Sequence, residues 1–588
     1  MKDFKDFTRE RSDREVLKRL FAYLKPHKKY FIWTLVFMAV SLLVQLLPPY
    51  LIGRIVDVIG DDELARASKE RTIITIAAFF AGLIVISNSF VYYQNYWLQR
   101  IGQKIVAKMR IDVFEHIESL AIGQINEVPV GKLVTRVAND TNVISEMYTN
   151  VAVNLIRNFL YLLGILIVLF LLNWRITLAL LGLIPLVILA SVIFRKYSRA
   201  SFRWVRSNVA EVNAFLSENL SGMKVTQIFN QEDKKKREFY ERNDQLEKSY
   251  LREILVFGIY RPTIYGFAMT GVVIALLIGI RDVLDPTVAF TAGMLFSYYM
   301  YVQDFFQPIQ QMAEQFNMLQ NAFASAEKIF DVLDTKPALV DADDAIELES
   351  FSGAIEFKDV WFQYIEDEWV LKGVSFRVNP GDTVAFVGAT GSGKTTILNL
   401  IVRNYDIQKG QILIDGIDIQ RIKRSSLRRH IGQMLQDVFL FSGTIKDNIT
   451  LNDPDITIEE VRQAAEYVGA DGFIESLPDG YEHVVRERGN NFSSGQRQLI
   501  SFARALVYKP SLIILDEATA NIDSETEELI QESLIRMMNI STMIIVAHRL
   551  STIQHADRII VMKKGEIKET GTHQQLLRHR GLYYHLYR

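Results

Sequence analysis

Cysteine is absent from the 588 residues, so the chain can form neither a disulfide framework nor a thiolate metal site. The sequence also has no large excess of charge of one sign, because it contains 66 lysines and arginines and 68 aspartates and glutamates. The net charge of −2 gives no indication of nucleic-acid binding, so no nucleic-acid partner is expected. A chain of this length exceeds what one hydrophobic core usually organises, which predicts at least two domains.

Long apolar runs fill the first half of the sequence, and they predict membrane spans. A helix needs roughly 20 mostly apolar residues to cross the bilayer core. Six segments meet this requirement: 30–52, 72–98, 151–172, 176–194, 254–280 and 287–308. Residues 1–29 are basic and carry apolar residues at helical spacing, which indicates a cytoplasmic helix lying on membrane lipids.

Lysine and arginine placement predicts the orientation. The N-terminal segment and the long connections 99–150 and 195–253 are basic, whereas the other connections are short or acidic. Both termini are therefore expected on the cytoplasmic side of a multi-pass protein, with the plasma (inner) membrane as the expected location.

The two long connections keep helical spacing, and each is interrupted once, near 120–129 and near 221–232. We expect hairpins of extended helices with a short transverse piece at each tip that docks on the soluble domain; flexible loops are the alternative. A linker follows at 335–353, and from 354 to 588 strand-like runs alternate with helical patterns. The expected architecture is an all-α transmembrane domain of six helices over 30–334, then an α/β P-loop domain.

A phosphate-binding loop stands in the second domain. The residues match G-x-x-x-x-G-K-[ST], after the strand-like 383–387 and before the helical 396–402. Glycines let backbone amides surround phosphates, and the helix N-terminus adds its positive end. Lys394 would reach the β- and γ-phosphates of ATP, and the Thr395 hydroxyl would bind Mg²⁺. The predicted ATP-binding segment is Gly388, Ala389, Thr390, Gly391, Ser392, Gly393, Lys394, Thr395 and Thr396.

An apolar run, 512–515, ends in two acids, Asp516 and Glu517. A buried strand that ends on carboxylates needs a cation, and Mg²⁺ held by Asp516 supplies one. Glu517 is then placed to polarise the attacking water. Alone, such a run is an ordinary strand edge, but downstream of a phosphate loop it becomes a specific partner.

The segment 491–498, Asn-Phe-Ser-Ser-Gly-Gln-Arg-Gln, resembles the ABC signature L-S-G-G-Q-x-Q. With a membrane domain before the ATPase domain, the chain resembles an ABC exporter half-transporter over essentially its whole length. The resemblance implies that Tyr364 stacks on adenine, that Gln436 senses Mg²⁺, and that His548 contacts the γ-phosphate beside the catalytic Glu517 and Lys394. Asp523 matches a loop that crosses to the partner domain. The implied metal ligands are Thr395, Gln436 and Asp516.

The resemblance also implies a dimer with a second half-transporter. Two ATPase domains meet head to tail, so that Ser493, Ser494, Gly495 and Gln496 of one chain touch ATP on the other. Ser494 stands where the family has a glycine, and Arg486 also departs from its pattern. This combination resembles the catalytic-glutamate subunit of heterodimeric bacterial multidrug exporters, in which one ATP site is weakened. A homodimer that tolerates serine is the alternative.

Polar residues inside spans are costly and usually face a cavity. Gln303, Asp304 and Gln307 lie on the sixth predicted span, and Asn88 and Tyr92 lie on the second. A cavity with aromatic walls and one carboxylate would suit hydrophobic small molecules that are amphipathic and often cationic. The predicted function is ATP-driven multidrug export; a lipid or lipid-precursor flippase is the alternative, and so is pairing of these residues between helices.

Overall fold

The computed structural model describes residues 12–516, 524–546 and 553–587. The chain divides into two compact units, which are described separately. The first contains residues 1–117 and 130–335, and the second contains 118–129 and 336–588. Residues 118–129 therefore belong with the C-terminal unit, although the sequence places them between two predicted spans. A helical N-terminal domain followed by an α/β domain confirms the predicted fold class.

The first unit is helical throughout its described residues. Short 3-10 and π-helical turns at 25–27, 136–140 and 147–151 join some of the helices. The α-helices are α1 (Asp13–Leu24), α2 (Lys28–Gln45), α3 (Leu47–Gly60), α4 (Arg66–Ser119), α6 (Val130–Thr135), α7 (Thr141–Glu146), α8 (Ala152–Leu172), α9 (Trp174–Leu181), α10 (Ile184–Ser221), α11 (Met223–Ile228), α12 (Glu232–Leu284) and α13 (Ala292–Asp334).

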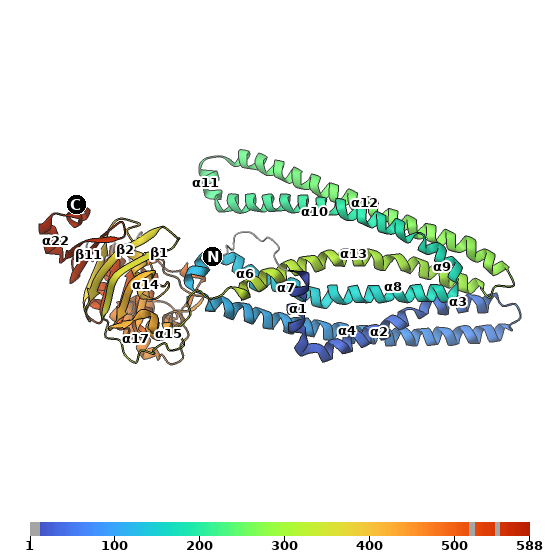
Figure 1. Cartoon of the computed structure of the whole chain (residues 1–588), viewed down its shortest axis with the longest axis horizontal. Coiled ribbons are helices and arrows are strands. Elements are labelled where there is room, and N and C mark those ends of the chain that lie inside the picture. Colours follow the sequence, from blue (N-terminus) through green and yellow to red (C-terminus); the bar gives the residue numbers. More distant parts are fainter. Residues whose placement is uncertain (1–11, 517–523, 547–552, 588) are drawn as a thin grey trace. The chain divides into compact units, whose positions relative to one another are not determined.

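Five helical stretches of the described residues are long and apolar enough to cross a membrane. They are Asp13–Gly60, Arg66–Ser119, Val130–Leu172, Trp174–Ser221 and Glu232–Leu284. The predicted span 287–308 falls largely in α13, which is not among the five, so the total of six stays a prediction. The helices α10 and α12 lie side by side and form a long hairpin with α11 at its tip (Figure 1).

Small residues allow α3 and α13 to approach closely. A Cβ on Gly53 would lie 2.3 Å from the Gly293 carbonyl oxygen and 1.9 Å from the Ser297 hydroxyl. At the same place the Asp57 carboxylate accepts hydrogen bonds from the Thr291 hydroxyl at 2.8 Å and from the Gly293 amide at 2.7 Å. Asp57 thus satisfies donors at the start of α13 that have no partner inside that helix.

The other end of α13 is tied to two helices of the same unit. Arg19 of α1 donates two hydrogen bonds to the Asp334 carboxylate, at 2.6 and 2.9 Å. His116 of α4 lies 2.9 Å from the Thr335 carbonyl oxygen. The last turn of α13 is therefore fixed before the chain enters the second unit.

Three sheets organise the described residues of the second unit. The six-stranded sheet has the order β12-β11-β3-β10-β9-β6, parallel except for β12, and the antiparallel sheet has the order β2-β1-β4-β5. A small sheet pairs β7 with β8. The strands are β1 (Ile355–Gln363), β2 (Trp369–Val378), β3 (Thr383–Val387), β4 (Lys409–Ile414), β5 (Ile417–Asp418), β6 (Ile431–Met434), β7 (Gly443–Thr444), β8 (Val484–Val485), β9 (Leu512–Asp516), β10 (Thr542–Val546), β11 (Arg558–Lys563) and β12 (Glu566–Gly571).

Helices surround these sheets, and two hydrophobic clusters fill the space between the layers. All five residues of β3 and of β10 are buried, as expected for inner strands covered on both faces. The helices are α5 (Ile122–Asn126), α14 (Lys394–Ile401), α15 (Arg424–Arg429), α16 (Ile445–Thr450), α17 (Ile458–Tyr467), α18 (Asp471–Glu475), α19 (Ser494–Val507), α20 (Ser524–Met537), α22 (His573–His579) and α23 (Leu582–Tyr587).

Candidate nucleotide site

The predicted phosphate loop joins β3 to α14. Gly391 and Gly393 have φ angles of +79° and +102°, which L side chains rarely adopt. A Cβ on Gly393 would also lie 2.7 Å from the Leu371 side chain. The loop can therefore follow this path because glycine occupies these positions, and it leaves backbone amides at the N-terminus of α14 free to face an anion.

Lys394 lies folded over this loop. Its amine donates to the carbonyl oxygens of Gly388 at 2.7 Å and Ala389 at 3.2 Å, and only 6% of the residue is exposed. Burial lowers the pKa of Lys394, and the Asp516 carboxylate nearby opposes this shift. The Ser392 hydroxyl beside it is buried and has no hydrogen-bond partner among the described residues. These groups form a cradle whose donors suit phosphate oxygens.

Oxygen ligands for a cation gather near the carboxyl ends of β6 and β9. These strands are parallel neighbours with Met434 opposite Leu515, so Gln436 and Asp516 follow adjacent strands at one sheet edge. Thr395 and Gln436 are exposed. Hydroxyl, amide and carboxylate oxygens suit Mg²⁺, which keeps waters and phosphate oxygens as its remaining ligands. Among the described residues, no group of three or more histidines, aspartates or glutamates could hold a metal ion. A cation here would therefore depend on waters and phosphate oxygens as further ligands.

Tyr364 follows β1 and stands at the side of the loop. Its hydroxyl donates to the Thr396 hydroxyl at 3.2 Å, and 46% of the residue is exposed. The Phe362 and Tyr405 rings meet its ring edge to face, with centroids 4.8 and 5.0 Å away. Tyr364 is thus held in place by three contacts while part of its surface stays open, as a stacking platform requires.

Three of the predicted residues, Glu517, Asp523 and His548, lie outside the residues that the structure describes. The strands that lead to the first and last of them are described, because β9 ends at Asp516 and β10 ends at Val546. These strands are adjacent and parallel, with Asp516 opposite Val546. The roles of the three residues stay predictions.

The signature-like segment begins a different helix, α19. The Ser493 hydroxyl accepts from the Gln496 amide at 3.2 Å, and the Gln496 side chain accepts from the Ser493 amide at 3.0 Å. This reciprocal pair is a capping box, which fixes the helix start. Ser494 is the first helical residue and Gly495 is buried, so serine at position 494 takes an ordinary helical backbone.

Arg486, the other departure from the family pattern, has φ −79° and ψ 171°. This extended conformation is open to any residue, so arginine causes no backbone strain there. The two departures therefore leave the local fold intact, and their effect must lie in the surface they present.

In the membrane unit, Asp304 of α13 accepts a hydrogen bond from the Tyr161 hydroxyl of α8 at 3.3 Å. Gln303 pairs with Tyr299 one turn away, and Gln307 is exposed. Asn88 and Tyr92 of α4 are exposed, and no hydrogen bond or ring contact within the described chain links them to Asp304. The structure thus brings Asp304 together with Tyr161 rather than with Asn88 and Tyr92 of α4.

The sequence analysis missed two residues that these contacts single out. Tyr161 gave no signal, because a tyrosine inside an apolar span is unremarkable by composition. Tyr405, which supports Tyr364, also belongs to no motif. It lies beside Tyr364 only because the 40 residues between them fold back, which no local pattern reports.

Two sequence families match the chain. Residues 31–309 match the ABC transporter transmembrane region, and residues 371–520 match the ABC transporter family. A "probable multidrug resistance ABC transporter ATP-binding/permease protein" of Bacillus subtilis is 40% identical over 87% of this chain and 76% of its own length. An "ATP-dependent lipid A-core flippase" of Syntrophus aciditrophicus is 32% identical over 97% of this chain and 94% of its own. A "fatty acid ABC transporter ATP-binding/permease protein" of Mycobacterium bovis is 34% identical, over 89% and 82%.

Proposed function

The chain belongs to the ABC transporters that carry a membrane domain and an ATPase domain on one polypeptide, and we propose that it exports amphipathic compounds as one half of an asymmetric dimer. It is a multi-pass membrane protein and an ATP-hydrolysing translocase of the exporter type. The observation that best supports this chemistry is that Lys394 lies between the phosphate loop and Asp516. Its amine donates to the Gly388 carbonyl oxygen, and the Asp516 carboxylate is close enough to affect the pKa of Lys394.

In the proposed site the loop amides and Lys394 bind the phosphates of ATP, and Tyr364 stacks on the adenine. Thr395, Gln436 and Asp516 would hold Mg²⁺, which neutralises phosphate charge when bound. Glu517 orients the attacking water and accepts its proton, while His548 donates a hydrogen bond to the γ-phosphate. Each protein group thus acts on charge or position, which is where the catalysis of phosphoryl transfer lies.

We place the asymmetry at Ser494. In a head-to-tail dimer the start of α19 faces ATP bound to the other chain, and the Cβ and hydroxyl of serine occupy space that glycine leaves free. The site that contains Ser494 would therefore bind ATP and turn it over slowly. The site that combines this chain's Glu517 with a partner's intact signature would hydrolyse it.

Both termini are proposed to lie in the cytoplasm and the protein in the inner membrane, because basic residues flank the corresponding spans.

For the substrate we propose amphipathic, often cationic compounds. The Asp304 carboxylate is half-buried inside the membrane unit. Among the described residues its hydrogen bond comes from the neutral Tyr161 hydroxyl, and an ionised group there favours a cation. Lipids or lipid precursors are the second candidate, since the relatives named as flippase and fatty acid transporter match 97% and 89% of the chain, at least as much as the multidrug relative.

The first test is Mg-ATP hydrolysis by this chain alone in lipid, compared with Glu517→Gln. Negligible turnover that a second half-transporter restores is the expected result. Robust, Glu517-dependent turnover by the chain alone would overturn the asymmetric dimer and leave the homodimer.

The substrate is tested with Asp304→Asn. Export of a cationic dye is expected to fall while export of an uncharged dye and basal ATP hydrolysis persist. Unchanged export of the cationic dye at normal hydrolysis would contradict the proposed role of Asp304. Stimulation of hydrolysis by lipids but by no dye would favour the flippase.

A further inference from the structure

The chain passes from one unit to the other at several points. Hydrogen bonds link the residues beside two of these points. One is the step from α4 to α5, at residues 117 and 118, and the other follows α13, at residues 335 and 336. In the first unit His116 contacts the Thr335 carbonyl oxygen at 2.9 Å. In the second, the Gln124 side chain of α5 donates to the Lys336 carbonyl oxygen at 3.0 Å and accepts from the Ala338 amide at 2.8 Å.

These two hydrogen bonds make Gln124 a clamp between α5 and the linker. A side-chain amide that both donates and accepts along one backbone stretch holds it much as a neighbouring strand would. The same oxygen also accepts from the Ala121 amide at 3.2 Å, which fixes the start of α5. The linker is therefore attached to α5 in the second unit.

The other face of α5 meets an aromatic ring of the ATPase unit. A Cβ on Gly123 would lie 2.5 Å from the Tyr405 ring, so only glycine allows this contact. Burial raises the pKa of the Tyr405 hydroxyl, and the nearby Asn126 side chain opposes this shift. Tyr405 in turn packs edge to face against Tyr364, the proposed adenine platform.

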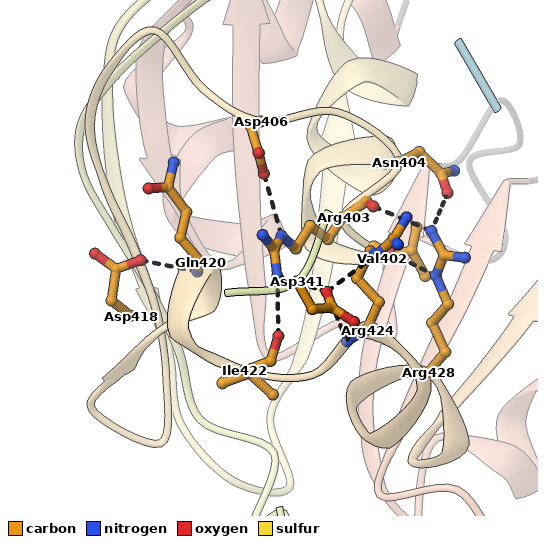
Figure 2. A network of polar contacts seen from close by, with 10 residues as sticks. All are labelled: Asp341, Val402, Arg403, Asn404, Asp406, Asp418, Gln420, Ile422, Arg424 and Arg428. Atoms are coloured by element: carbon orange, nitrogen blue, oxygen red, sulfur yellow. Dashed lines mark hydrogen bonds and ion pairs between the residues drawn. The ribbon is translucent and has the colours of Figure 1, made fainter. Parts of the chain in front are cut away.

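A polar network around the buried guanidinium of Arg403 holds Arg403, Asn404 and Asp406 in place (Figure 2). Arg403 has a left-handed φ of +49°, and its guanidinium donates to the Ile422 carbonyl oxygen at 2.9 Å and to Asp406 at 3.1 Å. Arg428 donates to the carbonyl oxygen of Arg403 at 3.0 Å and to the Asn404 side chain at 3.1 Å. These bonds fix both sides of Tyr405.

The linker enters this network through Asp341. Its carboxylate accepts from the Arg424 guanidinium at 3.1 Å and lies 3.4 Å from that of Arg403 (Figure 2). The linker is thus bonded at one end to α5 and at the other to the network that holds Tyr405.

We propose that α5, linker residues 336–341 and residues 403–406 move as one joint, and that Tyr405 is a positioning residue through which this joint sets the adenine platform Tyr364. Both α4 and α13 end on the joint, so a displacement of either helix reaches one place in the ATPase unit. Tyr405 then changes how the site holds ATP without touching the reacting phosphate. The last step rests on the proposed role of Tyr364, whereas the joint itself does not.

The cysteine-free sequence allows a direct test of the joint in the full chain, assembled as its active dimer in lipid. Gln124→Cys and Ala338→Cys are combined and joined with a short bis-thiosulfonate reagent, and each single variant treated with the same reagent serves as control. If α5 and the linker move together, the cross-linked protein should keep hydrolysing ATP at the rate before cross-linking. Loss of hydrolysis on cross-linking, or failure of the two thiols to react together, would overturn the joint.

The role of Tyr405 is tested by separating binding from turnover. Tyr405→Leu removes the ring and is expected to raise KM for ATP about fivefold while kcat stays unchanged. The reason is that losing one edge-to-face ring contact weakens binding by roughly this factor. Tyr405→Phe keeps the ring and should restore KM. An unchanged KM in Tyr405→Leu would refute the role of Tyr405, provided that Tyr364→Ala raises KM. An unchanged KM in Tyr364→Ala would instead refute the proposed adenine platform.

Discussion

Arg403 combines a buried charge with a strained backbone, so two replacements at this one position separate the two effects. Its side chain is 3% exposed and donates to Ile422 and Asp406, with Asp341 beside it. Arg403→Ala removes these bonds and leaves the backbone at φ +49°. We expect the ATPase unit to lose about 2 kcal/mol of unfolding free energy, the usual contribution of hydrogen bonds to a charged group, because the acids left behind stay partly exposed to water.

Arg403→Gly removes the same bonds but suits the left-handed backbone. An L side chain in this region costs roughly 1–2 kcal/mol, so the glycine variant should be more stable than the alanine variant by about 1 kcal/mol. The order is unusual, because glycine normally destabilises relative to alanine.

Arg421 provides the matched control. It is exposed and lies in a 3-10 turn with an ordinary backbone, and the described chain gives its side chain no ion pair. Arg421→Gly should therefore be less stable than Arg421→Ala, the reverse of the order at position 403.

Amide hydrogen exchange in the full chain measures these differences locally. The slowest amides of β3 and β6 report opening of the ATPase unit, and a difference of about 1 kcal/mol changes their exchange rate about fivefold. The reasoning is refuted if glycine and alanine show the same order at both positions. It is also refuted if Arg403→Ala exchanges like the unmodified chain.

Three further predictions follow from particular contacts. Gly53→Ala should prevent α3 from packing on α13, because its Cβ would lie 1.9 Å from the Ser297 hydroxyl. It should therefore lower the yield of monodisperse protein in size-exclusion chromatography. Gly82→Ala is the control and should leave this yield unchanged, because nothing lies within 4 Å of its Cβ. Burial lowers the pKa of Lys394, so its charge is lost at a lower pH than that of an ordinary lysine. The affinity for a fluorescent ATP analogue should therefore fall as the pH rises into the alkaline range, and Lys394→Met should remove this dependence. Ser494→Gly should raise the hydrolysis rate of the dimer if serine weakens the second site, and an unchanged rate would contradict that explanation.

Much of the fold could be predicted because its signals are local. Apolar runs of span length predict membrane helices, and five such stretches are present in the described chain. The interruptions near 120–129 and 221–232 coincide with α5 and α11. The phosphate loop is equally local, since eight consecutive residues contain its turn, its cation and its hydroxyl.

The sequence by itself determined the apolar helices, the α/β domain and the glycine-rich turn between β3 and α14, because each depends on residues that are neighbours along the chain. Hydropathy and glycine at fixed spacing act over a few residues, so they can be recognised without tertiary contacts. Only the tertiary structure decided the pairs Asp304–Tyr161, Gly123–Tyr405 and Asp341–Arg424. Their members are far apart in sequence and belong to no repeat. Their proximity results from how helices and sheets pack, a choice made by the sum of many buried contacts rather than by any one motif.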